Sequence, residues 1–147
     1  MSTTFRTRIA MLAVVLLALP LLAACGGPSA PSDVNVSLKT FTITLSSPTA
    51  KAGDVTFHIK NDATDITHEF VILKTDQTPE QLLQEAYDAA NKTLDEEKTT
   101  PVTEMEDIDP GKGGDLKANL AAGHYVLVCN TPDHYKAGMH AEFTVVP

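Results

Sequence analysis

One stretch near the C-terminus decides how this chain folds: Tyr125-Val-Leu-Val-Cys129-Asn-Thr-Pro-Asp-His134-Tyr-Lys-Ala-Gly-Met139-His-Ala-Glu-Phe-Thr-Val145. It begins as a strand pattern that ends on a cysteine, passes through a loop with a proline and a glycine, and ends in a second strand pattern. Side chains alternate along a strand, so Tyr125, Leu127 and Cys129 share one face and Cys129 points inward at the strand's end. The spacing Cys-x4-His-x4-Met then returns His134 and Met139 to the same end.

This loop carries a set of donor atoms that suits copper. Cys129, His134 and Met139 offer a thiolate, an imidazole and a thioether, which together form a soft ligand set. A blue, or type 1, copper site uses one Cys and two His in a plane with a long, weak axial Met. One further His from elsewhere would complete it. A free Cys is more commonly a small buried apolar residue, but that alternative leaves the spacing unexplained.

The chain has five histidines from which the remaining ligand must come. His68 begins an apolar strand pattern directly after a polar loop, and we predict that it is the ligand. His58 alternates out of phase with its apolar neighbours and is expected to face solvent. His124 lies in a turn, and His140 points away from Met139 by alternation.

The N-terminus reads as a targeting segment. Residues 1–24 carry two arginines followed by an uncharged apolar run, which is typical of a signal peptide. The sequence Leu22-Ala-Ala-Cys25 resembles the lipobox of bacterial lipoproteins, which implies cleavage before Cys25 and lipid on its thiol. An ordinary signal peptide cut nearby, or an uncleaved anchor, are the alternatives. We expect residues 25–33 to be a lipidated flexible tether and residues 34–147 to be one domain. The protein is expected to be held outside the cytoplasm on a bacterial membrane, in the periplasm or on the outer face.

Charge and cysteine content narrow the function further. Residues 25–147 hold nine lysines against nineteen acidic residues, a formal charge of −10 with His neutral. This charge argues against a nucleic-acid-binding protein, which is expected to carry a basic surface. With lipid on Cys25, Cys129 has no partner for a disulfide. An oxidising compartment favours disulfides, so a single free Cys there is explained by metal ligation.

The remaining pattern predicts an all-β protein with one inserted helix. Strand patterns, several of them with period-two alternation, lie at 34–38, 41–45, 55–61, 68–73, 116–120, 125–129 and 141–145. A phase slip near residues 39–40 indicates a bulge or a strand that changes partners. Thr78, Pro79 and Gln81 form a helix start, and apolar residues at helical spacing predict a helix over about 79–97. Residues 98–114 read as a polar loop with room for one short strand.

The segment Tyr125–Val145 resembles the ligand loop of the cupredoxins, the family of plastocyanin, azurin, auracyanin and rusticyanin, with a spacing most similar to the rusticyanin type. The likeness extends over most of 34–147. It implies a Greek-key β-sandwich and one type 1 copper ion bound by His68, Cys129, His134 and Met139. The chain departs from the family at Glu69, where many members place an Asn that braces the two ligand loops.

Together with the lipobox-like sequence before Cys25, this resemblance implies a membrane-anchored electron-transfer protein outside the cytoplasm whose copper cycles between Cu(I) and Cu(II). Electrons would pass through the edge of His134 to redox partner proteins, with Pro132, Tyr135 and Ala137 rimming an apolar docking patch. The acidic stretches 95–97 and 104–107 are a solvated face or a docking face for a basic partner.

Three other functions agree less well with the sequence. A copper chaperone or storage module would expose extra Met or His, but residues 25–147 contain only Met105 and Met139. A copper oxidase or nitrite reductase needs a second copper site, and the three spare His are scattered, so we expect no enzyme. A metal-free adhesion sandwich leaves the loop spacing unexplained.

Overall fold

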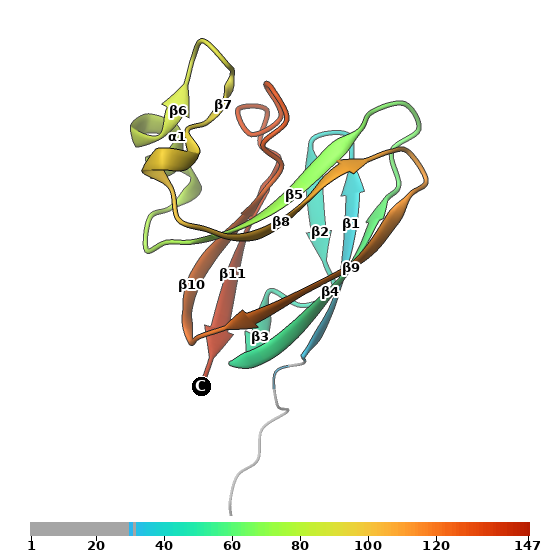
Figure 1. The fold of residues 1–147 in the computed structure, drawn as a ribbon, viewed down its shortest axis with the longest axis vertical. Coiled ribbons are helices and arrows are strands. Elements are labelled where there is room, and N and C mark those ends of the chain that lie inside the picture. The colour runs from blue at the N-terminus through green and yellow to red at the C-terminus, as the bar shows by residue number, and fades with distance from the viewer. Residues whose placement is uncertain (1–29, 31) are drawn as a thin grey trace, which may run out of the picture.

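The computed structural model describes residue 30 and residues 32–147, which form a sandwich of two β-sheets with a small insertion at one side (Figure 1). The predicted signal peptide, the predicted lipidation site Cys25 and residues 26–29 and 31 of the predicted tether lie outside the described residues. Within the described residues, no helix has the length and apolar character needed to cross a bilayer.

The first sheet has the strand order β2-β1-β4-β9. Its strands are β1 (Asp33–Lys39), β2 (Thr42–Leu45), β4 (Gly53–Asn61) and β9 (Gly113–Leu120). β1 runs parallel to β4, whereas β2 and β9 are antiparallel to their neighbours. Alternation places one set of side chains in the core and leaves the other face polar, as the sequence predicted for β1 and β4.

The second sheet has the strand order β3-β11-β10-β5-β8. Its strands are β3 (Thr49–Lys51), β5 (His68–Lys74), β8 (Pro101–Ile108), β10 (Gly123–Val128) and β11 (His140–Val146). The central strands β5 and β10 are buried on both faces, because one face meets the other sheet and the opposite face meets the insertion. Their near-continuous apolar sequences follow from this double burial.

Between the sheets lies one apolar core, with Phe57, Phe70 and Phe143 at its centre. The Phe57 ring lies 5.7 Å from that of Phe70 and 5.4 Å from that of Phe143, centroid to centroid. Tilted and edge-on pairs of this kind stabilise a core beyond simple burial. The predicted all-β sandwich with an inserted helix is confirmed.

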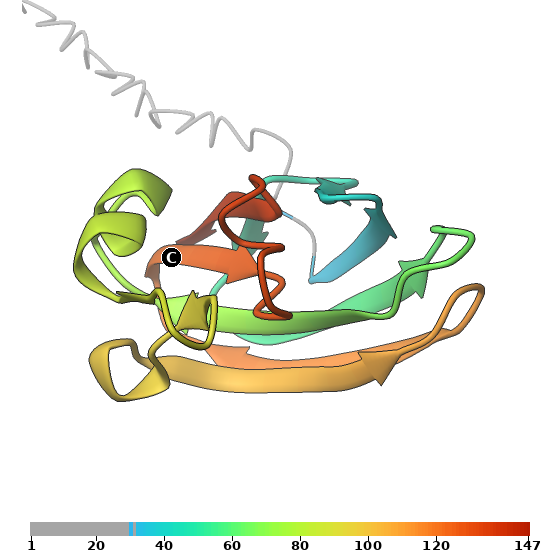
Figure 2. The ribbon, with the colours of Figure 1, turned by 90° about the horizontal axis from the view of Figure 1, so that it is seen from above.

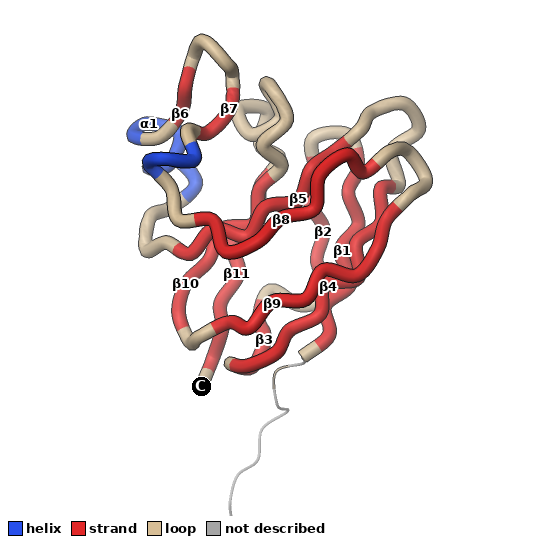
Figure 3. The backbone as a smooth tube through the Cα atoms, viewed as in Figure 1, coloured by secondary structure: helices blue, strands red, loops and turns tan. Residues whose placement is uncertain are grey.

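The insertion between β5 and β8 differs from the expected single helix over about 79–97. It contains α1 (Pro79–Glu85), β6 (Tyr87–Asp88), β7 (Thr93–Leu94) and a 3-10 turn at Glu96–Lys98, as Figure 3 shows. The helix start was predicted correctly: Thr78 and Gln81 form a reciprocal capping box. The helix ends at Glu85 because Asp88 accepts hydrogen bonds from the N–H groups of Ala90 and Asn91, which folds the chain into a turn.

Three further expectations need correction. The phase slip near residues 39–40 is neither a bulge nor a change of partner but a tight hairpin in which Lys39 pairs with Thr42. Residues 98–114 contain the full eight-residue strand β8. The sequence did not predict this strand because its side chains are mostly polar: it is an edge strand of which only Ile108 is buried. The connection after β2 contains the short strand β3.

Candidate metal centre

The ligand loop, residues 129–139, joins β10 to β11 at one pole of the sandwich. Its ends are held together because the Cys129 N–H donates to the Met139 carbonyl at 3.0 Å. Inside the loop, the Met139 N–H donates to the His134 carbonyl, also at 3.0 Å. Gly138, with φ +98°, adopts a conformation that disfavours any side chain. These bonds fix where Cys129, His134 and Met139 stand relative to one another.

His68 reaches the same pole from the start of β5, and Asn61 fixes the loop before it. The buried Asn61 amide donates to the carbonyls of Ile66 at 2.8 Å and Ile108 at 2.7 Å, and accepts from the Ala63 N–H at 2.9 Å. Every polar atom of this side chain is therefore used within the fold. The role of Asn61 was not predicted from the sequence, where its only signal is a polar residue at the end of an apolar strand.

The structure brings three of the predicted ligands into contact. Cys129 Sγ lies 3.3 Å from His134 Nδ1 and 3.8 Å from His68 Nδ1, and the two Nδ1 atoms are 3.3 Å apart. Met139 is fully buried and belongs to the same apolar cluster as Cys129. Two imidazole nitrogens and a thiol sulfur thus share one enclosed space at the pole.

The electrostatics of the cluster favour soft metal binding. Burial lowers the pKa of both His68 and His134, and the neighbouring imidazole of His134 lowers that of His68 further. Neutral imidazoles are the form that binds metal. Burial raises the pKa of the Cys129 thiol. Two hydrogen-bond contacts of the sulfur lower this pKa, one with Thr131 and one with the backbone N–H of Glu69, whose nitrogen lies 3.3 Å from Sγ. Because a buried anion needs a counter-charge, a thiolate here requires a cation at the same place.

The His68 ring presents Nδ1, and not Nε2, to the cluster. His68 Nε2 is buried and has no hydrogen-bond partner among the described residues, while Nδ1 faces Cys129 and His134. A proton on Nε2 leaves Nδ1 as a lone-pair donor aimed into the cluster. The Cys, two His and Met set therefore fits one type 1 copper ion.

Phe41 is a second residue whose place was not predicted from the sequence. The strand expected over 41–45 begins only at Thr42, and Phe41 lies in the β1–β2 turn with φ +55° and is 39% exposed. Its ring meets the His134 ring edge-on, with 5.2 Å between centroids. A positive φ in a bulky residue is uncommon and costs free energy. Phe41 therefore belongs to the exposed apolar surface next to His134.

The predicted docking residues divide into two kinds. Pro132 and Ala137 are exposed beside His134, and their docking role stays a prediction. Tyr135 is only 2% exposed and donates its hydroxyl hydrogen to the Pro79 carbonyl at 2.7 Å. Its expected place on a docking rim is therefore wrong. The side chain instead points beneath the loop, because it fills the apolar cluster under the insertion.

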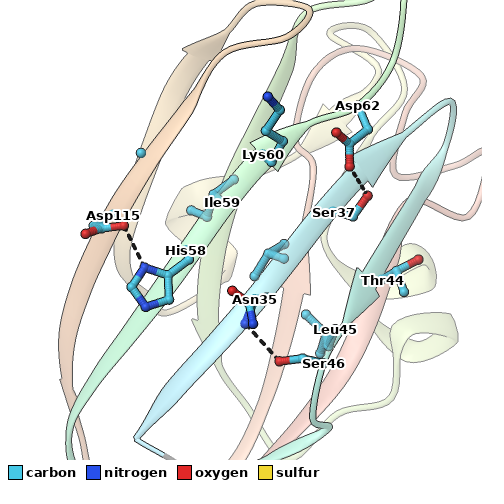
Figure 4. A pocket seen from close by; sticks show the side chains of 12 residues that line it. Asn35, Ser37, Thr44, Leu45, Ser46, His58, Ile59, Lys60, Asp62 and Asp115 are labelled. Carbon is cyan, nitrogen blue, oxygen red and sulfur yellow. Dashed lines mark hydrogen bonds and ion pairs between the residues drawn. The ribbon is translucent and has the colours of Figure 1, made fainter.

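The other histidines lie away from this cluster. His58 is on the outer, polar face of β4, where Nδ1 lies 2.7 Å from Asp115 (Figure 4). Its Nε2 lies 3.4 Å from Asp33. This confirms that it faces solvent. His124 Nδ1 contacts the Thr75 carbonyl at 2.7 Å. The His140 ring packs on Tyr135.

Comparison with known proteins agrees with a copper site at this pole. Residues 33–146 match the family described as copper binding proteins, plastocyanin/azurin family. The chain belongs to this family. A comparison with the curated proteins finds no match to this cupredoxin.

Among solved structures, the cupredoxin is similar to reduced auracyanin from Roseiflexus castenholzii, with 24% identity and a TM-score of 0.63 over 81% of this chain and 100% of that one. It is also similar to auracyanin A from Chloroflexus aurantiacus, with 20% identity and a TM-score of 0.56 over 78% of this chain and 99% of that one. An azurin from Methylomonas sp. strain J gives 15% identity and a TM-score of 0.55 over 78% and 98%. These likenesses establish the fold.

Glu69 makes the surroundings of this cupredoxin's site distinctive. Burial, followed by the charges of Glu104 and Glu96, raises the pKa of Glu69 to about 7. Among the described residues, its carboxylate makes no hydrogen bond to the ligand loop, although its backbone N–H contacts the Cys129 sulfur. The side chain after the first histidine therefore does not brace the loop here.

Proposed function

We propose that this cupredoxin is a blue copper electron carrier, with His68, Cys129, His134 and Met139 as the copper ligands. The observation that carries the proposal is the convergence of Cys129 Sγ and two imidazole Nδ1 atoms within 3.3–3.8 Å of one another. Bound copper would take up and release one electron between Cu(II) and Cu(I). The buried, hydrogen-bonded ligands would move little, so the protein contributes a fixed geometry to both states.

His134 is the proposed exit for the electron. It is 7% exposed, whereas His68 and Met139 are fully buried, so its ring edge is the part of the ligand set nearest to solvent. Phe41, Pro132 and Ala137 flank it and form the proposed docking patch, with Phe41 in place of Tyr135. Redox contacts of this kind are small and short-lived. The partners would be redox proteins that accept an apolar surface around His134.

The membrane anchor is a separate part of the proposal. Lipid on Cys25 would hold the protein on the outer side of a bacterial membrane, as the Leu22–Cys25 sequence suggests. The placement of β1 supports this arrangement, because β1 starts at the pole opposite the ligand loop in Figure 1. A tether entering there would leave the docking patch facing away from the lipid.

A matched pair of cysteine variants tests the anchor. Cys25→Ser should move the protein from the membrane fraction to the soluble fraction and abolish labelling by a radioactive fatty acid. Cys129→Ser should keep both the membrane location and the label. Equal labelling of the wild type and Cys25→Ser would remove the lipid anchor from the proposal.

A copper chaperone or storage module is the alternative function. Such a protein must exchange its metal, which requires accessible ligands. Here Cys129, His68 and Met139 are fully buried, and this burial favours electron transfer over metal exchange.

Spectroscopy of the copper-loaded protein tests the main proposal. An intense thiolate-to-copper visible band with narrow hyperfine splitting in electron paramagnetic resonance is expected. His68→Ala should abolish or convert that signal, and His58→Ala, on the outer face of β4, should preserve it. The reverse pattern would assign the ligand to His58. A colourless wild-type protein with ordinary copper splitting would instead favour the alternative function.

A further inference from the structure

The insertion between β5 and β8 lies directly against the ligand loop. In Figure 2, seen from above, the loop stands between the insertion on one side and the β1–β2 hairpin on the other. Three residues of the loop, namely Asn130, Asp133 and Tyr135, hydrogen-bond to the insertion. These three adjoin Cys129 and His134 in sequence, so the bonds act on the backbone that carries two proposed ligands.

Asn130 makes the most specific of these contacts. Its Oδ1 accepts from the Leu94 N–H at 2.7 Å, and its Nδ2 donates to the Leu94 carbonyl at 3.2 Å. The side chain is 9% exposed, and Leu94 is buried beside it. Both polar ends of one amide are therefore paired with both polar groups of one peptide residue. Loss of such a buried pair leaves groups unsatisfied, which is costly.

Asp133 forms a second connection, to Lys92. The Asp133 N–H donates to the Lys92 carbonyl at 2.8 Å, and Lys92 Nζ lies 2.8 Å from Asp133 Oδ2. Both residues have positive φ, 64° for Lys92 and 68° for Asp133, although neither is glycine. Two strained turns thus meet at one contact. The Asp88 side chain holds the Lys92 turn in shape through the N–H groups of Ala90 and Asn91.

Tyr135 forms the third connection between the ligand loop and the insertion. Its hydroxyl donates to the Pro79 carbonyl, at the first turn of α1. The ring packs in a cluster with Leu82, Ala86 and Leu94 of the insertion and with Val126 and Val128 of β10. The insertion therefore has its own apolar attachment to the sheet that carries the loop.

We propose that the insertion is a clamp that holds the ligand loop in its metal-binding geometry before copper arrives, with Asn130 as the main positioning residue. The proposal rests on the copper site described above. The insertion would brace the ligand loop, which the Glu69 side chain does not do. A loop ordered in advance loses less entropy when it binds the metal, and it reorganises less between the two copper oxidation states.

Hydrogen exchange on the copper-free protein tests the clamp without relying on copper chemistry. Asn130→Ala should speed exchange of the loop amides of His134, Ala137 and Met139 by about ten-fold or more, as expected for the loss of a buried hydrogen-bonded pair. The amides of β4 and β9 should keep their protection. Asn119→Ala is the matched control, because the exposed side chain of Asn119 in β9 hydrogen-bonds, among the described residues, only to the exposed Asp54 of β4.

Two milder variants keep the test decisive if Asn130→Ala does not fold. Tyr135→Phe removes only the hydroxyl contact, and Asn130→Asp keeps the acceptor for the Leu94 N–H but loses the donor. Both should speed loop exchange, with the larger effect in Asn130→Asp. Unchanged loop exchange, or an equal increase in β4 and β9, would overturn the clamp.

Copper titration separates this proposal from the proposed function. If the wild type binds copper and gives the blue spectrum, Asn130→Ala should weaken Cu(II) binding by about ten-fold and change the hyperfine splitting, while Asn119→Ala should not. If the wild type binds no copper, the proposed function fails, yet the exchange result still decides whether the clamp exists. Wild-type copper affinity and spectrum in Asn130→Ala would overturn the clamp alone.

Discussion

Met139 illustrates how one side chain can set a property of the whole site. It is fully buried, and its own backbone closes the ligand loop through the Cys129 N–H. Its role as a weak axial donor would be to stabilise Cu(II) more than Cu(I). The thioether is therefore expected to adjust the reduction potential without being needed to retain the metal.

Replacement of Met139 by leucine tests this role. Met139→Leu should keep copper and raise the reduction potential, because a donor to Cu(II) is lost. Each ten-fold selective loss of Cu(II) affinity corresponds to about 59 mV in voltammetry. An unchanged or lower potential would count against Met139 as the axial ligand.

Replacement of Phe41 by glycine is expected to affect electron transfer more than stability. Its φ of +55° is a conformation that glycine adopts freely and phenylalanine does not. Phe41→Gly should change the free energy of unfolding by less than about 1 kcal/mol in chemical denaturation, because relief of the positive φ offsets the packing lost with a side chain that is 39% exposed. The same variant should slow electron self-exchange, because the apolar surface beside His134 is removed. Destabilisation by more than about 1 kcal/mol would show that the ring is structural.

At the scale of elements, Asn61 links the end of β4 to β8 and to the loop that delivers His68. Asn61→Ala should lower the free energy of unfolding by about 3 kcal/mol, because backbone groups that were paired become unsatisfied inside the protein. Asn119→Ala, at an exposed position of the same sheet, should change it by less than about 0.5 kcal/mol. Chemical denaturation of the two variants compares them directly, and equal effects would contradict the assignment.

Three strands of the first sheet meet at His58, which predicts a specific pH response. A hydrogen bond to Asp115 on β9, helped by Asp33 on β1, raises the pKa of His58 above 6.5. A raised folded-state pKa means that the contact adds stability below the unfolded pKa and loses it as pH rises through the folded value. Asp115→Asn should lower the pKa of His58 more than Asp33→Asn does, as measured by NMR titration of the ring. The opposite ranking would mean that Asp33 is the stronger partner.

At the scale of the whole molecule, the core and the copper site are separate sources of stability. Phe57, Phe70 and Phe143 lie between the sheets, whereas the proposed ligands lie at one pole. The copper-free protein should therefore remain folded and unfold cooperatively. Copper should add stability that depends on its concentration, about 4 kcal/mol at a thousand times the dissociation constant. Calorimetry with and without a chelator measures the difference, and an unfolded copper-free protein would contradict it.

The sequence by itself determined the sandwich and the ligand spacing, because strand alternation and a Cys-x4-His-x4-Met loop are local patterns. Those patterns also predicted the approach of His68 to Cys129 and His134, which the structure confirms by distance. Only the tertiary structure decided the length of the helix, the edge strand β8 and the fate of Tyr135. The helix was ended by contacts within the insertion, namely the Asp88 turn and the β6–β7 pair. Long-range contacts decided the other two cases: pairing with β5 made β8 a strand, and the insertion buried Tyr135. Asn61, Phe41 and Asn130 were missed for the same reason, since their partners lie far away in the sequence or across a turn.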